Sequence, residues 1–158
     1  MHSKVMMVLA QTEYGEHPYM YHIQQVMDEV LKMIMGNKFV HHFMDDNLLH
    51  DELIDLYLTC AIGHDIIEDT NVVPYDMVEL GIPYSVIIGI LGVTKVDGES
   101  QEEYITKVCS NPMSLFIKIA DSHCNMTQSV KDGDKKWSAK YAKLNGLLLE
   151  KWDELYEQ

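Results

Sequence analysis

The feature that most constrains this chain is an apolar segment that ends abruptly in ionisable residues. Leu58–Gly63 carries no charge, and His64, Asp65, Glu68 and Asp69 follow it. An apolar approach of this kind indicates a buried helix, and burying ionisable groups without partners is costly. A divalent cation removes that cost, because neutral imidazole and ionised carboxylate are both good metal ligands. The segment therefore predicts a central buried helix with a metal site at its end.

Helical periodicity accounts for most of the remaining sequence. Apolar residues recur three or four positions apart, and glycine, asparagine and proline separate the periodic stretches. Ser100 and Glu103 have the spacing of a capping box, and Pro112 suits a first helical turn. We expect helices over Tyr19–Met35, Asn47–Ile67, Tyr75–Leu80, Tyr84–Val93, 100–109, Met113–Met126 and Trp137–Leu155.

These helices predict an all-α fold class, a helical bundle that forms one domain over residues 1–158 around a central metal site. The β-branched run 86–90 has the propensity of a strand, but it has no second strand with which to pair. We therefore expect a helix there as well.

Charge and cysteine content restrict the classes of partner. The chain has 12 Lys+Arg against 25 Asp+Glu and a net charge of −13, which repels nucleic acid and anionic membranes. We therefore expect a small-molecule partner, with no nucleic acid and no membrane. The three cysteines lack a C-x-x-C spacing and predict reduced thiols. With no long apolar segment at the N-terminus, we expect a cytoplasmic protein, or one in the host cytoplasm if a phage encodes it.

Two further residues are candidate metal ligands. His22 lies near the start of an amphipathic helix, and Asp121 is an acid within the apolar stretch Phe116–Ala120 and its continuation. With His64 and Asp65 they form a set of two histidines and two aspartates that leaves coordination positions open, as catalytic metal sites require. Glu68 and Asp69 follow one helical turn later, so they face the same cavity and can position and deprotonate water.

The residues in this order resemble a known family. His22, His64-Asp65 and Asp121 match the signature of the HD superfamily of metal-dependent phosphohydrolases. The chain is most similar, over about residues 17–127, to the hydrolase domain of RelA/SpoT proteins, which remove the 3′-diphosphate of the alarmones ppGpp and pppGpp. The blocks that carry this resemblance are His64–Thr70, Gly92–Lys95, Gln101–Tyr104 and Lys118–Met126.

The resemblance implies roles for individual residues. His22, His64, Asp65 and Asp121 would hold one divalent metal, most often Mn²⁺, with Zn²⁺, Fe²⁺ or Mg²⁺ as other candidates. Glu68 and Asp69 would activate the attacking water. Asn125, Lys95 and Lys118 would contact the nucleotide. The implied function is a guanosine 3′,5′-bis(diphosphate) 3′-pyrophosphohydrolase, which converts ppGpp to GDP and pyrophosphate.

Two departures keep other functions open. The family places a basic pair before the first histidine, whereas this chain has the acidic segment Thr12–His17. The interval between His22 and His64 is also long, so we expect Phe39–Asp46 to form a loop near the mouth of the site. The alternatives are an HD phosphohydrolase for another nucleotide (a 5′-deoxynucleotidase, an NADPH 2′-phosphatase or a cyclic-nucleotide hydrolase) and a non-catalytic nucleotide-binding module.

Some of the candidate residues also have structural interpretations. Glu68 and Asp69 could simply end a helix, and Asn125 could cap one. Lys135, Lys136, Lys140 and Lys143 on the last helix could bind a phosphate tail or form a solvated face.

Overall fold

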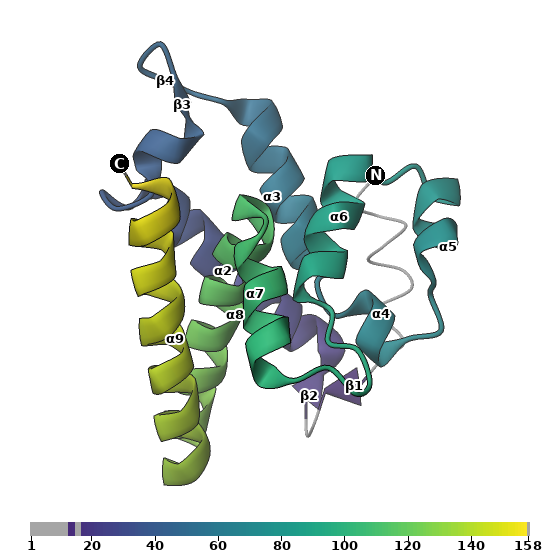
Figure 1. The fold of residues 1–158 in the computed structure, drawn as a ribbon, viewed down its shortest axis with the longest axis vertical. Helices are drawn as coiled ribbons and strands as arrows, with labels where there is room; N and C mark the ends of the chain where they lie inside the picture. Colours follow the sequence, from purple (N-terminus) through teal and green to yellow (C-terminus); the bar gives the residue numbers. More distant parts are fainter. Residues whose placement is uncertain (1–12, 15–16, 158) are drawn as a thin grey trace.

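Helices form most of the described chain, which comprises residues 13–14 and 17–157 of the computed structural model (Figure 1). The strands are two short antiparallel pairs, β1 (Glu13–Tyr14) with β2 (His17–Pro18), and β3 (Met44–Asp45) with β4 (Leu48–Leu49). The predicted all-α fold is confirmed. The helices are α2 (Tyr19–Met35), η1 (Val40–Phe43), α3 (Asp51–Gly63), α4 (Ile66–Asp69), α5 (Pro74–Glu79), α6 (Tyr84–Val93), α7 (Gln101–Cys109), α8 (Pro112–Lys131) and α9 (Lys135–Tyr156).

Local capping explains where several helices begin. Ser100 Oγ accepts a hydrogen bond from the Glu103 amide at 3.1 Å, and Glu103 Oε2 accepts one from the Ser100 amide at 2.8 Å, which is the predicted capping box. Asn111 caps α8 and Asp134 caps α9 in the same way, each through the amide three residues later. Gly133, with φ +72°, allows the reversal between these two helices.

Several expected boundaries differ from the structure. The helix expected from Asn47 begins at Asp51, because Leu48–Leu49 form β4, and α9 begins at Lys135, two residues before the expected Trp137. Helix α8 extends to Lys131, beyond the expected end at Met126. The stretch 47–67 is divided: α3 ends at Gly63, His64 and Asp65 form a turn, and α4 is a separate short helix. The apolar residues before and after His64 and Asp65 keep the spacing of one continuous helix. The sequence pattern therefore does not reveal the break between α3 and α4.

The segment between α2 and α3 does not lie near the predicted site. It forms η1 and a hairpin of β3 and β4 whose central residues, Asp46 and Asn47, both have positive φ. Two consecutive positive φ values are typical of a type I′ turn, which asparagine and aspartate tolerate. The hairpin precedes the N-terminus of α3, whereas His64 follows its C-terminus (Figure 1). The expectation of a loop at the mouth of the site was therefore wrong.

An aromatic cluster forms the core at the hairpin end of the bundle. Its rings meet edge to face, with centroids 4.8–5.7 Å apart, a geometry that aromatic pairs favour. The cluster joins η1, α3, α8 and α9 and thus fixes the helices that carry His64 and Asp121. Its members are Phe39, Phe43, Tyr57, Phe116 and Trp152.

Two glycines of α6, Gly89 and Gly92, allow this helix to approach α8 closely. Gly89 also faces α3. A Cβ atom at Gly92 would lie 2.0 Å from Ser114 Oγ, and one at Gly89 would lie 2.8 Å from Met113 Sδ and 3.0 Å from Cys60 Sγ. Ser114 Oγ donates a hydrogen bond to the Gly89 carbonyl at 2.9 Å. This contact anchors the first turns of the helix that carries Asp121. Within the described part of the chain, no helix combines the length and the apolar character that a membrane span needs.

Candidate metal centre

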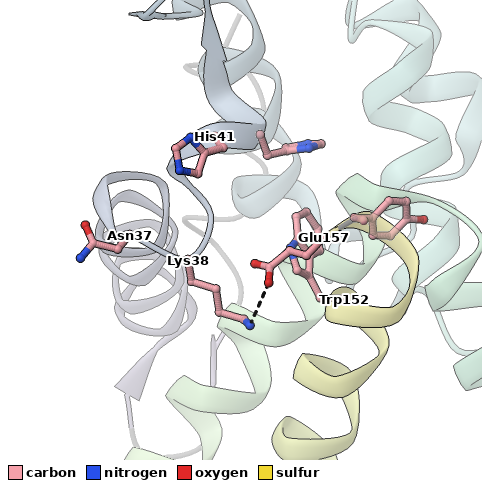
Figure 2. Close-up of a pocket in the computed structure, with 7 residues that line it drawn as sticks. Asn37, Lys38, His41, Trp152 and Glu157 are labelled. Atoms are coloured by element: carbon pink, nitrogen blue, oxygen red, sulfur yellow. Dashed lines mark ion pairs between the residues drawn. The ribbon is translucent and has the colours of Figure 1, made fainter.

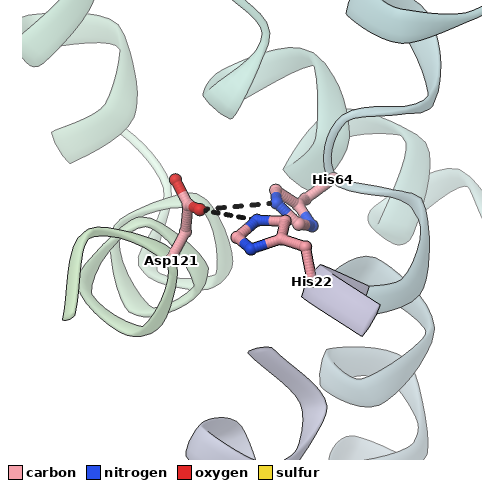
Figure 3. A group of neighbouring side chains, drawn as sticks. All are labelled: His22, His64 and Asp121. Atoms are coloured by element: carbon pink, nitrogen blue, oxygen red, sulfur yellow. Dashed lines mark ion pairs between the residues drawn. The ribbon is translucent and has the colours of Figure 1, made fainter. Parts of the chain in front are cut away.

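Four predicted residues from three parts of the fold lie together in the interior. His22 is in the first turns of α2, His64 and Asp65 form the turn between α3 and α4, and Asp121 is in the middle of α8. The two histidines and Asp121 are 1–3% exposed. Figure 3 shows both imidazoles pointing toward the Asp121 carboxylate.

The atoms that face one another are the ones a metal would bind. His22 Nε2 lies 3.1 Å from Asp121 Oδ1, and His64 Nε2 lies 3.6 Å from the same oxygen. Asp65 Oδ2 is 3.0 Å from His64 Nε2 and 3.8 Å from His22 Nε2. Two ligand atoms bound to one ion at about 2.1 Å lie roughly 3.0–3.4 Å apart at octahedral or tetrahedral angles. The observed separations are close to this range.

The hydrogen bonding of His64 defines which ring nitrogen faces the cluster. Its Nδ1 lies 2.7 Å from the Ala61 carbonyl, which can only accept, so Nδ1 carries a proton. Among the described residues, its buried Nε2 has no partner with hydrogen-bond geometry. In the neutral ring this nitrogen presents a lone pair toward two carboxylates. A cation between them would resolve this arrangement, and a contact such as the one with the Ala61 carbonyl is what orients histidines that bind metals.

The charges of the cluster determine which of its groups are ionised. An ionised carboxylate can bind a metal, and without a metal a protonated histidine can balance its charge. Burial alone would raise the pKa of Asp121, but Lys118 and the two histidines hold it well below its usual range. Burial alone would lower the pKa of His64, but Asp65 and Asp121 raise it well above its usual value. Against the effect of burial, the pKa of Asp65 is also lowered, mainly by the charge of His64, so both aspartates favour the ionised state and a positive charge is favoured on or beside His64.

The group His22, His64 and Asp121 can therefore hold a metal ion. Its donors are two imidazole nitrogens and a carboxylate oxygen, a set that suits Zn²⁺, Mn²⁺ and Fe²⁺ alike, so it does not select one of them. Asp65 adds a fourth donor at the edge of the group, where its side chain is 19% exposed.

Glu68 and Asp69 lie beside the cluster on α4 and stay outside the ligand group. The Asp69 amide donates to the Asp65 carbonyl at 2.9 Å, so one helical turn places Asp69 above Asp65 as predicted. Glu68 Oε1 accepts from the Lys95 amide at 2.8 Å. Burial and the nearby charge of Asp65 raise the pKa of Asp69, and burial raises that of Glu68. Both carboxylates are thereby made more basic than in water.

The three predicted substrate residues occupy different positions. Lys118 Nζ donates to Asp121 Oδ2 at 2.8 Å, and Asn125 Nδ2 donates to Asp121 Oδ1 at 2.8 Å. Both therefore orient a candidate ligand. The exposed side chain of Lys95 places its ammonium 5.9 Å from the centre of the Tyr104 ring. A cavity of about 400 Å³ beside it is lined by Glu68, Lys95 and residues 96–99.

Sequence reasoning missed two supporting side chains. The buried Tyr104 donates to the Val93 carbonyl at 2.7 Å, and the ammonium groups of Lys95, Lys107 and Lys118 lie 5.5–5.9 Å from its ring centre. Asn145 on α9 donates to the Ile119 carbonyl and to Ser122 Oγ, both at 2.9 Å, and so ties α9 to α8 next to Asp121. A buried asparagine on the apolar face of an amphipathic helix was the available signal.

Other candidate features lie elsewhere or outside the described residues. Three of the six residues of the acidic segment Thr12–His17, at positions 12, 15 and 16, lie outside the described residues. A cavity of about 630 Å³ lies between η1 and the C-terminal end of α9, where Lys38 forms an ion pair with Glu157 and Trp152 forms part of the wall (Figure 2). None of the predicted site residues is among the described residues that line it. Lys135, Lys136, Lys140 and Lys143 are exposed on α9.

Comparison with known proteins adds no family. No protein-family model matches the chain, and no curated protein is significantly similar to it.

Proposed function

We propose that this chain is a metal-dependent phosphohydrolase that acts on a phosphorylated nucleotide. The observation that carries the proposal is His64, whose Nδ1 is bound by the Ala61 carbonyl and whose buried Nε2 faces Asp65 and Asp121. His22, His64, Asp65 and Asp121 would hold one divalent ion. Such an ion supplies Lewis-acid stabilisation of phosphoryl oxygens and lowers the pKa of water.

Glu68 and Asp69 are the proposed proton acceptors. Their carboxylates lie next to the ligand group without belonging to it, and their raised pKa values favour removal of a proton from attacking water. The contact of Glu68 with the Lys95 amide holds one carboxylate oxygen in place. Lys118 and Asn125 would act as positioning residues, since both hold the Asp121 carboxylate.

Lys95 is the proposed phosphate-binding residue. Its ammonium is exposed next to the cavity that also contains Glu68, and an ammonium neutralises phosphate as a compact point charge. Lys107 is less suited, because its ammonium contacts the Glu99 carboxylate and the Thr94 carbonyl, both with separations of 2.8 Å.

The substrate we propose is guanosine 3′,5′-bis(diphosphate), from which hydrolysis would release pyrophosphate and leave GDP. This choice is supported by the blocks that resemble the alarmone hydrolase domain. The acidic segment Thr12–His17, where that family has basic residues, favours a second candidate: the same metal chemistry applied to another nucleotide. Mn²⁺ is the proposed metal, by the same resemblance.

The test is a substrate panel with Mn²⁺ and with a chelator. The panel contains ppGpp, pppGpp, NADPH, deoxynucleoside monophosphates and cyclic nucleotides, and pyrophosphate and phosphate are measured separately. Pyrophosphate released only from the alarmones would support the first candidate, and turnover of another nucleotide would support the second. Bound metal without turnover of any compound would refute the enzyme and favour a nucleotide-binding module.

Variants separate the ligands from the proton acceptors. We expect Glu68→Gln and Asp69→Asn to lose turnover by about 100-fold or more while still binding Mn²⁺, because general-base catalysis contributes on that scale. Asp121→Asn should lose both turnover and Mn²⁺, measured by equilibrium dialysis. Glu79→Gln, an exposed acid at the end of α5, is the matched control and should leave both unchanged.

A further inference from the structure

Helix α9 presents an unusual pair of aromatic side chains near its N-terminal end. Trp137 is 42% exposed, and its ring stacks on that of Tyr141 with centroids 5.8 Å apart and planes inclined by 27°. The ammonium of Lys140 lies 4.3 Å from the centre of the Trp137 ring. Tryptophan and tyrosine side chains that present their rings in this way are enriched at interfaces.

The packing of α9 on α8 places this pair on the same side of α9 as Asn145, which contacts α8 next to the metal centre. Asn145 lies beside Asp121 because it bonds to Ile119 and Ser122. Trp137 and Tyr141 precede Asn145 by two turns and one turn, so all three follow one face of α9. The antiparallel α8 carries Asn125 and Ser129 in the same direction, one and two turns beyond Asp121 (Figure 1).

Tyr141 connects the pair electrostatically to the site. Its side chain is half-buried, and the charges of Asp121, Lys118 and Asp65 all act on its hydroxyl group. Tyr141, which stacks on Trp137, is therefore near enough to the metal ligands for their charges to act on it.

The local charge also differs from that of the whole protein. Residues 131–143 contain five lysines and two aspartates, while the chain as a whole carries −13. A phosphorylated ligand would meet a favourable potential at this end of α9 and an unfavourable one over most of the remaining surface.

We propose that Trp137 and Tyr141 form a platform on which the base of the nucleotide stacks, with Lys140 beside it as a positive contact. This inference rests on the proposed function, because it assigns the base-binding part of that substrate. Aromatic stacking accepts any base, since every base has a π-face, and removal of one stacking side chain typically weakens binding roughly 5- to 140-fold.

Ligand binding tests the platform without catalysis. GMP, AMP and ribose 5-phosphate are titrated into the Mn²⁺-loaded protein, with equilibrium dialysis as the readout and fluorescence quenching as a second readout in the wild type. We expect both nucleotides to bind more tightly than ribose 5-phosphate and to quench Trp137, since the other tryptophan, Trp152, is buried.

The variants are Trp137→Ala and Tyr141→Ala, with Trp137→Phe and Tyr141→Phe as stacking-competent counterparts. The alanine variants should lose at least 5-fold in GMP and AMP affinity and keep the affinity for ribose 5-phosphate, while the phenylalanine variants retain most of both. Tyr84→Ala, which removes a 75% exposed tyrosine from α6, is the control and should change neither.

The results separate this platform from the proposed activity. Nucleotide binding that depends on Trp137 in a protein without hydrolytic activity would keep the platform and remove the enzyme. Hydrolysis with the KM for nucleotide unchanged in Trp137→Ala would keep the enzyme and refute the platform. Equal losses for GMP and ribose 5-phosphate would also refute it, because they would indicate charge or folding effects instead of stacking.

Discussion

Replacement of Gly92 by alanine tests how closely α6 and α8 must pack to hold the site. The new methyl group would lie 2.0 Å from Ser114 Oγ and 2.8 Å from Ser114 Cβ, both far inside van der Waals contact. Ser114 is buried and its hydroxyl donates to the Gly89 carbonyl, so it cannot move away without losing that bond. Rotation of the Ser114 side chain can move Oγ, but it cannot move Cβ, which is fixed to the backbone of α8.

The magnitude follows from three terms. Overpacking a buried site costs about 1–3 kcal/mol, and loss of the buried Ser114 bond costs about 1–3 kcal/mol. Alanine is better than glycine in a helix by about 1 kcal/mol, which offsets part of this cost. The expected loss in the free energy of unfolding is therefore about 1–5 kcal/mol. Gly146→Ala is the matched control: no heavy atom lies within 4 Å of its new methyl, so we expect a gain of up to about 1 kcal/mol.

Urea unfolding followed by far-UV circular dichroism measures both variants. The double variant Gly92→Ala with Ser114→Gly removes the atoms that clash, and should show a favourable coupling of at least about 1 kcal/mol in a double-mutant cycle. A Gly92→Ala protein within about 0.5 kcal/mol of the wild type, or a cycle without coupling, would refute the close approach of the two helices.

Three other predictions concern the metal site, Lys118 and His42. Chelation of metal should lower the melting temperature, and Mn²⁺ at 100 times its Kd should raise the free energy of unfolding by about 2.7 kcal/mol. Asp121→Asn should abolish this increase, and an equal increase in that variant would exclude the site. Lys118→Met should destabilise the metal-free protein by about 3–5 kcal/mol in urea unfolding, since the mostly buried Asp121 carboxylate loses its cation, and a loss below about 1 kcal/mol would contradict this assignment. Burial lowers the pKa of His42, so the folded state prefers the neutral ring. The contribution of His42 to the free energy of unfolding is therefore complete above pH 6.5, the pKa of the unfolded state, and declines as the pH falls toward the lower pKa of the folded state. His42→Gln should flatten that decline, measured as the free energy of unfolding between pH 5 and pH 8, and an unchanged slope would assign it to other groups.

The helices were predictable because their signals are local. The bounds of α2, α6 and α7 follow from periodicity together with Pro18, Pro83 and the capping box at Ser100. The break at His64-Asp65 was not predictable in this way. The apolar spacing on both sides is compatible with one continuous helix, and the turn is stabilised by contacts with α2 and α8 that lie far away in the sequence.

The candidate ligands were predictable as residue types, and their partners were not. A histidine or acid in an apolar helix has to be satisfied, which singles out His64 and Asp121 without a structure. Lys118 and Asn125 lie three and four residues from Asp121, so their contacts with it also follow from helical spacing. Which ring nitrogen of His64 faces inward depends on the Ala61 carbonyl, and the pattern of residue types contains no trace of that bond.

The charge balance of the site explains how so acidic a chain could bind a polyanion. Asp65, Asp121, Glu68 and Asp69 gather four carboxylates around two histidines, and the mostly buried Lys118 is committed to Asp121. A phosphate group brought to this cluster would meet net repulsion, which increases in a low-dielectric interior. A divalent cation held by the two histidines and Asp121, together with the exposed lysines of α9, would offset this repulsion. A net charge of −13 is thus compatible with the phosphorylated ligand that we propose.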